Sequence, residues 1–231
     1  ADLPAVYGDE LRLAFDLRGP PTDPGRWDGR IYARGADLAL ERWLAPWREA
    51  TRFAARGRGD AELWGQWSGG RLQRVQARTA LREFVLARDD APAEVSFGRL
   101  AGRFAWSRIE GGWRVNVADL AVEREGRAWR SDGFSLARRQ RAGETADWRG
   151  HVDFARAQDV LALARLMPLP QGMSAPFERV TGGRAIQGDV RALRFHARAQ
   201  DDFAVRATLR DVGWAPGEPL PGVHGLDGEL A

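Results

Sequence analysis

Three histidines, His151, His196 and His224, are the side chains best suited to acid–base or metal chemistry near neutral pH. A metal site needs several His, Cys or carboxylate ligands at set spacings, and a general base needs an orienting partner. None of the three histidines has a partner at such a spacing, and the chain contains no cysteine. His151 and His196 fall on the polar side of alternating segments, and His224 lies in a Pro/Gly-rich tail. We interpret all three as structural residues.

The carboxylates and short motifs indicate no reaction either. Asp89–Asp90 and Asp201–Asp202 are adjacent pairs in turn-like contexts, whereas glycoside hydrolysis needs two carboxyl groups facing one sugar. No nucleophile elbow, phosphate-binding glycine loop or zinc-protease motif is present. The sequence therefore predicts a protein that is not an enzyme and that has no metal and no cofactor.

The charge pattern argues against nucleic-acid binding. The 35 basic residues are all arginine and stand against 32 acidic ones, which leaves a net charge of +3. A nucleic-acid protein usually clusters its basic residues, but here they alternate with apolar residues along nearly every segment. We interpret the arginines as a solvated polar face. No apolar run reaches the ~18–20 residues that a membrane-spanning helix needs.

Strict alternation of apolar and polar residues is the strongest structural signal. It marks strands with one dry and one wet face, and it favours an antiparallel sheet because buried parallel strands are continuously apolar. The alternating segments are 10–18, 60–67, 74–82, 113–119, 190–200 and 203–210. Turn residues at 19–25, 68–70, 110–112, 130–133 and 181–183 separate such segments and predict roughly ten or more strands.

Helix is scarce. The segment 37–47 has Asp37 as a candidate N-cap and an apolar stripe, and the segment 158–168 ends at Pro168. We expect two short helices packed against the sheet. They are too small to cover the apolar face, so this face requires a second sheet, a closed barrel, or a bent sheet that meets an apolar ligand.

Ten tryptophans add to the apolar face. Trp67, Trp106, Trp113 and Trp148 follow the apolar side of the alternation, which favours core or lipid contact over stacking on sugars.

A phrase of Trp, Gly and an aliphatic residue occurs twice, each time before a helical pattern. The first copy is Trp27, Gly29 and Ile31, and the second is Trp148, Gly150 and Val152. Repetition of a strand–helix phrase is typical of modular proteins. We predict that 1–231 is a single fragment of a longer repeat protein, with sub-repeats at 1–142 and 143–231.

Several segments resemble a known family, the YhdP branch of the AsmA-like envelope proteins. They are GRWDGRIYARGADLALERW from Gly25, the segment Gly98–Leu136 with its Gly-Trp-x-Val strand and Asp-Leu-x-Val phrase, and the tail Gly188–Leu230 with its Asp-Val and Pro-Gly-Val-x-Gly-Leu-x-Gly phrases. The resemblance implies a mainly β fold, a long curved antiparallel sheet that forms a groove (a β-taco), related to the bridge-like lipid transfer proteins. It also implies an inner-membrane anchor outside this fragment, a periplasmic location and movement of phospholipids toward the outer membrane.

On this basis we expect phospholipid acyl chains to lie along a groove wall of twelve apolar residues, called the wall residues below. They are Leu13, Phe15, Leu63, Trp67, Leu81, Phe104, Trp106, Val115, Val117, Phe195, Val205 and Leu209. Arginines at the rim would meet phosphate headgroups. The alternatives are a structural or assembly module that docks other envelope proteins, an outer-membrane barrel, and polysaccharide binding through tryptophan.

Overall fold

The computed structural model describes residues 4–231 with the exception of 21, 90–93, 167–185, 200–201 and 217–220. The described part contains eleven strands: β1 (Glu10–Arg18), β2 (Asp28–Ala39), β3 (Phe53–Ser68), β4 (Arg71–Arg88), β5 (Glu94–Ile109), β6 (Gly112–Arg124), β7 (Arg127–Arg139), β8 (Asp147–Arg156), β9 (Ile186–Ala199), β10 (Asp202–Trp214) and β11 (Val223–Leu230). The helical elements are η1 (Pro24–Arg26), α1 (Leu40–Leu44), η2 (Ala45–Trp47), α2 (Arg48–Thr51) and α3 (Ala157–Leu166).

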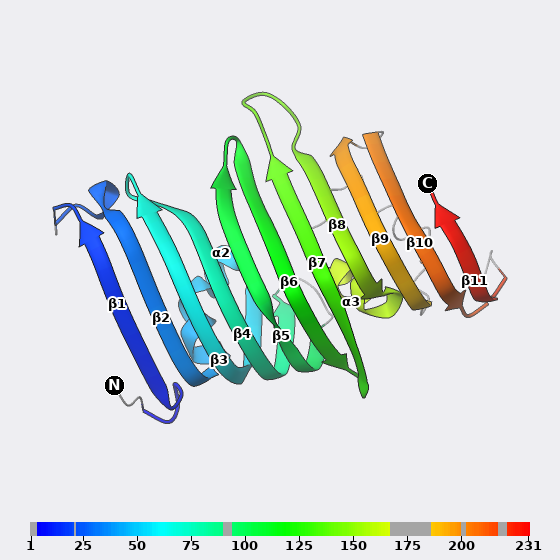
Figure 1. Cartoon of the computed structure of the whole chain (residues 1–231), viewed down its shortest axis with the longest axis horizontal. Helices are drawn as coiled ribbons and strands as arrows, with labels where there is room; N and C mark the ends of the chain where they lie inside the picture. Colours follow the sequence, from blue (N-terminus) through cyan, green and yellow to red (C-terminus); the bar gives the residue numbers. More distant parts are fainter. Residues whose placement is uncertain (1–3, 21, 90–93, 167–185, 200–201, 217–220) are drawn as a thin grey trace. The chain divides into compact units, whose positions relative to one another are not determined.

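The eleven strands are hydrogen-bonded in the order in which they occur in the chain, from β1 to β11 (Figure 1). The pairing is antiparallel from β1 to β5 and from β7 to β11, as a meander of hairpins requires. The predicted mainly β class, the antiparallel sheet and the number of strands are confirmed. Two compact units are present, one of Ala1–Ile109 with Trp113–Ala128 and one of Glu110–Gly112 with Trp129–Ala231. The sub-repeats 1–142 and 143–231 stay a prediction.

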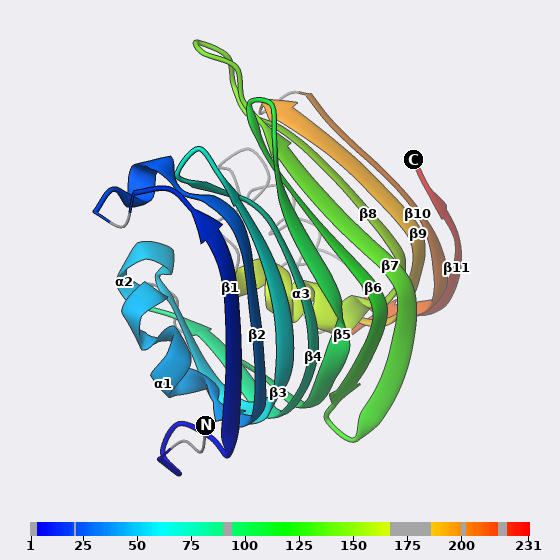
Figure 2. The ribbon, with the colours of Figure 1, turned by 60° about the vertical axis from the view of Figure 1, so that its left-hand side comes forward.

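In unit 1, the first predicted helix follows β2 without a loop and consists of α1, η2 and α2 in succession. Figure 2 shows β2–β5 bent, with α1 and α2 on the inner side of the bend. The Trp43 indole donates a hydrogen bond of 2.8 Å to the carbonyl of Tyr7, and the two rings meet edge to face at 6.0 Å. Leu40 is buried, and Val95 and Phe97 are among the buried residues of the core.

Asp37 is not the N-cap that the sequence predicts. Ala39 occupies that position without a side-chain capping bond, and Asp37 lies inside β2 with φ +47°. Asp119 in β6 and Asp211 in β10 have the same left-handed conformation, with φ +52° and +50°. All three are the aspartate of the recurring Asp-Leu or Asp-Val phrase. Aspartate tolerates this conformation better than most residues, because its short polar side chain can hydrogen-bond locally.

Two of these aspartates, Asp37 and Asp211, lie where strands change register. Shifts occur between Gly35 and Leu38 in β2 and between Leu209 and Val212 in β10. A bulge of this kind bends a strand and leaves an amide outside the regular ladder. In both places a carboxylate of the following strand accepts that amide: Asp37 N donates to Asp60 Oδ1 at 3.0 Å, and Asp211 N donates to Asp227 Oδ1 at 2.8 Å. At Asp37 and Asp211 the Asp-Leu or Asp-Val phrase therefore marks the place where the strand bends.

In unit 2, α3 follows β8 directly and lies against β8 and β9 (Figure 2). This confirms the second predicted helix, although Pro168 lies outside the described residues. Leu161 and Leu166 are buried. The buried carboxylate of Asp159 accepts a hydrogen bond of 2.6 Å from the Trp129 indole of β7, which ties the helix to the sheet.

The prediction of a turn at 130–133 is wrong, because these residues lie inside β7. The chain reverses at Glu125–Gly126 instead, where both residues have positive φ. Ser131 is buried, and its hydroxyl accepts a bond of 3.3 Å from the amide of Phe154 and donates one of 3.2 Å to the carbonyl of Gly133. The Ser131 hydroxyl therefore satisfies backbone groups inside the sheet, although serine in this sequence context is also typical of a turn. The predicted turn at 181–183 lies outside the described residues.

The two copies of the repeated phrase occupy similar places in the chain. Each copy leads a strand, β2 or β8, that passes directly into a helix. Gly150 is required because a Cβ there would collide with the ring of Phe195 on β9. At Gly29 a Cβ would collide with the carbonyl oxygen of Asp16 on β1. Gly29 thus lets the backbone of β1 approach closely, whereas Gly150 leaves room for the side chain of Phe195.

Candidate functional site

The register of β1–β5 gathers many apolar residues of unit 1 on one side of the sheet, because directly paired residues point to the same side. We call this side the apolar face. Its cross-strand rows are Leu11, Gly35, Ala61, Thr79 and Gly102; then Leu13, Ala33, Leu63, Ala77 and Phe104; then Phe15, Ile31, Gly65, Val75 and Trp106; and at the end Leu17, Gly29, Trp67 and Leu72. No charged residue occurs in these rows.

Seven of the wall residues belong to the apolar face of unit 1. Leu13, Phe15, Leu63, Trp67, Phe104 and Trp106 stand in the rows above, and Leu81 continues them between Gly59 and Leu100. Val115 and Val117 lie two residues apart in β6 and therefore point to the same side of that strand. In unit 2, Phe195 of β9 is paired directly with Val205 of β10, and Leu209 is paired with Val190. The structure thus brings together seven wall residues in unit 1 and pairs Phe195 with Val205 in unit 2. Val115 and Val117 also belong to unit 1, and a register shift separates Leu209 from the pair in unit 2.

The wall residues remain partly open to solvent. Only Leu81 and Val117 of the twelve are buried, and the side chains of β1 are the most open, with Leu13 52% and Phe15 60% exposed. Five strands about 4.8 Å apart and four rows about 6.7 Å apart give an apolar area of roughly 400 Å². Contiguous apolar patches of a few hundred Å² on soluble proteins often mark interaction sites.

The opposite side of the same strands, the polar face, carries the arginines. One of its rows is Arg12, Arg34, Glu62, Arg78 and Arg103. Ion pairs between strands balance part of this charge, among them Arg78 with Glu62 at 3.7 Å and Arg103 with Asp119 at 2.5 Å. The predicted solvated polar side is therefore present in unit 1.

Asp37 is the centre of an ion-pair group on unit 1. Its carboxylate lies 2.6 Å from Arg58 of β3 and 2.6 Å from Arg82 of β4. The hydrogen bond from Arg58, together with the positive charges of both guanidinium groups, holds the pKa of Asp37 below its ordinary value. The bulge aspartate thus links three consecutive strands.

An arginine stands at one margin of the apolar side of unit 2. Leu136, Gly150, Phe195 and Val205 form one cross-strand row there, and the next row toward the strand ends contains Arg138, Trp148, Ala197 and Phe203. The Arg138 guanidinium lies 5.8 Å from the centre of the Trp148 ring, within the range of a cation–π contact. The positive charge of Arg138 thus lies beside the apolar surface of unit 2.

His151 and His196 have polar partners in the structure. His151 lies with Nε2 2.6 Å from Asp153 and Nδ1 3.1 Å from the carbonyl oxygen of Leu193, and His196 Nε2 lies 2.9 Å from Asp147. His224 lies in β11. Among the described residues, no group of three or more His, Cys, Asp or Glu side chains could hold a metal ion.

No helix in the described part of the chain is both long and apolar enough to cross a membrane.

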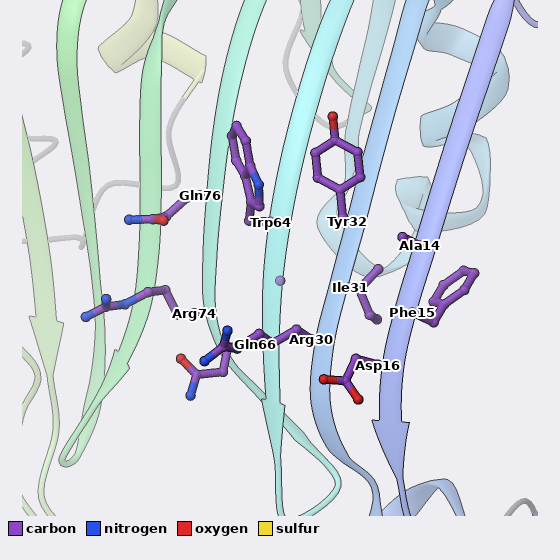
Figure 3. A pocket seen from close by; sticks show the side chains of 11 residues that line it. Ala14, Phe15, Asp16, Arg30, Ile31, Tyr32, Trp64, Gln66, Arg74 and Gln76 are labelled. Atoms are coloured by element: carbon purple, nitrogen blue, oxygen red, sulfur yellow. The ribbon is translucent and has the colours of Figure 1, made fainter.

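The polar face of unit 1 also contains a hollow of about 470 Å³, which the sequence does not predict (Figure 3). Two adjacent cross-strand rows line it: Ala14, Tyr32, Trp64 and Gln76, and then Asp16, Arg30, Gln66 and Arg74. Phe15, Ile31 and Gly65 lie between these rows and form its floor. The sequence indicates only the side of Trp64, which is three residues before Trp67 and therefore has the opposite parity; the register is needed to place Tyr32 beside it.

These features define a mainly β protein whose antiparallel strands carry an uncharged apolar face on one side and an arginine-rich face on the other. The chain belongs to the YhdP family, because the family model described as "YhdP protein" matches residues 3–231. The sequence is 23% identical over 241 residues to the "Intermembrane phospholipid transporter YhdP" of Escherichia coli (strain K12). The aligned region covers 96% of this chain and 18% of that protein. The chain thus spans less than a fifth of the relative's length. No solved structure matches it.

Proposed function

We propose that this chain is a segment of an intermembrane phospholipid transporter and that acyl chains lie against its apolar face. The observation that carries the proposal is the set of uncharged rows on β1–β5, which stay partly open to solvent. The relative from Escherichia coli, an intermembrane phospholipid transporter by name, supports the choice of ligand.

The binding force in this proposal is the removal of apolar area from water, worth roughly 25 cal/mol per Å². This force is not directional, so an acyl chain can shift along the rows without breaking specific bonds. The proposed contact surface consists of the wall residues of each unit. Phe15 and Leu13 on β1 offer the most exposed contacts.

The polar headgroup would stay at the margin of the apolar surface. Arg138 is suited to this role because it lies beside Trp148, next to the apolar row of unit 2. A guanidinium group can also donate two parallel hydrogen bonds to two oxygens of one phosphate. The arginine-rich polar face would meet water. We propose a location in the periplasm between the two membranes, and a function that involves no catalysis.

The test is native mass spectrometry of the chain purified from Gram-negative cells without detergent, followed by lipid extraction. We expect phospholipids to be retained, and to be displaced by added lipid of a distinguishable mass. A chain that carries no phospholipid and accepts none from vesicles would refute the proposal. That result would favour the second candidate, an assembly module whose apolar face docks another envelope protein.

A further inference from the structure

The hollow on the polar face of unit 1 has a composition that differs from the rest of that face. It combines two neighbouring aromatic rings with two guanidinium groups, two amides and one carboxylate (Figure 3). We propose that this hollow binds an anionic saccharide, a sugar unit that bears a carboxylate or a phosphate group. The proposal is independent of lipid transport, because the hollow lies on the opposite side of the strands from the apolar face.

The aromatic row supplies a platform for a sugar ring. Tyr32 and Trp64 are paired across β2 and β3, with ring centres 5.7 Å apart and planes inclined by 53°. Trp64 is 39% exposed, so it is not needed to fill a core. The hydroxyl of Tyr32 donates a hydrogen bond of 2.9 Å to Glu62, which fixes its ring. Rings that are already ordered and exposed bind the apolar face of a ligand at little cost in side-chain entropy.

The second row supplies the charge. Arg30 and Arg74 stand on either side of Gln66 in the register of β2, β3 and β4. Neither guanidinium forms an ion pair with any residue that the structure describes, unlike Arg58, Arg78 and Arg82 on the same face. Two free guanidinium groups against one carboxylate, Asp16, favour a ligand with a negative charge.

The remaining polar groups match sugar hydroxyls. The amides of Gln66 and Gln76 each offer donors and an acceptor, and the Asp16 carboxylate offers acceptors. Sugar hydroxyls both donate and accept, so they can use all three side chains. A volume of about 470 Å³ lies within the range of about 300–1,000 Å³ that is usual for ligand pockets. A lipid tail would leave these polar groups without partners, which disfavours it as the occupant.

The test is calorimetric titration of the chain with two probes, trigalacturonic acid for the carboxylate form and glucose 6-phosphate for the phosphate form. We expect at least one probe to bind, and both Trp64→Ala and Arg74→Gln to weaken its binding about tenfold or more, which corresponds to about 1.4 kcal/mol or more. The matched control is Arg114→Gln, which removes an exposed arginine of β6 outside the hollow and should leave the affinity unchanged.

Three results would overturn the proposal. The first is the absence of binding by both probes at millimolar concentration. The second is an equal loss in Arg74→Gln and Arg114→Gln, which would indicate general electrostatic attraction. The third is equal binding of the neutral counterparts, trigalacturonic acid methyl ester and glucose. Thermal unfolding of Trp64→Ala verifies its fold. Its phospholipid content should equal that of the unchanged chain, which separates this site from the proposed lipid face.

Discussion

A negative charge placed in the middle of the apolar face should block lipid binding. Ala77 of β4 is the best position, because Leu63 and Phe104 are its cross-strand neighbours and Val75 and Thr79 are its neighbours along the strand on the same side. Ala105 of β5 provides a matched control. It is also a half-buried alanine on an adjacent strand, but it is paired with Gln76 on the polar face.

The size of the effect follows from the environment of Ala77. An aspartate at the centre of an apolar bilayer costs about 2.5–3.5 kcal/mol, and each 1.4 kcal/mol is a tenfold change in affinity. Full coverage of Asp at position 77 by an acyl chain would therefore weaken binding by roughly 60- to 300-fold. The face is partly open, so the carboxylate can turn toward water, and we expect a loss of about tenfold or more.

The assay is transfer of a fluorescent phospholipid from vesicles to each variant, with native mass spectrometry as the second readout. Ala77→Asp should lose most of its lipid, whereas Ala105→Asp should keep it. Circular dichroism and thermal unfolding verify that both variants fold, and Ala77→Asn, which adds similar volume without charge, should lose less than Ala77→Asp. Equal lipid content in folded Ala77→Asp and Ala105→Asp would refute the assignment of the apolar face as the lipid-binding surface.

Three further predictions concern the fold and can be measured by urea unfolding. Gly150→Ala should destabilise the chain by about 1–3 kcal/mol, because the added Cβ meets the ring of Phe195; an unchanged midpoint would contradict this contact. Asp119→Val should cost about 1–2 kcal/mol, because a β-branched residue fits φ +52° poorly, whereas Asp119→Gly should cost much less; equal losses would argue against backbone strain. Asp37→Asn removes a carboxylate whose pKa is lowered in the folded state by Arg58. The stabilisation by Asp37 is therefore present above its ordinary pKa of 3.8 and disappears as the pH falls through the folded-state value, so the difference between the two proteins should shrink at low pH. A difference that stays constant with pH would contradict the ion-pair explanation.

Much of the fold can be predicted from the alternation alone. The segment 10–18 is an alternating run and coincides with β1, and the segment 157–166 lies close to the predicted second helix. The bends cannot be predicted in this way, because period-2 patterning does not reveal where a strand changes register. Asp37 precedes a helical pattern and therefore resembles an N-cap, although the structure uses it as the left-handed residue of a bulge.

The candidate site can be predicted in part. Alternation gives the side of the sheet for Leu63 and Phe104, and the register then shows that Ala77 lies between them. The hollow could not be found without the register, because Tyr32 and Trp64 are 32 residues apart in the sequence and meet only as cross-strand neighbours. Trp67, Trp106, Trp113 and Trp148 follow the apolar parity, whereas Trp64 has the opposite parity and lies on the polar face.

The strand order has a consequence for how the chain reaches its native state. Each strand pairs only with the strands that come immediately before and after it in the sequence. Strands that pair are therefore close in the sequence, which is a low contact order for a β protein. Each new strand can pair with the edge of the strands already formed as the chain emerges from the ribosome. Insertion or deletion of a whole hairpin would leave the remaining pairings intact. The sheet can therefore gain or lose strands during evolution while the path of the chain through the other strands stays the same.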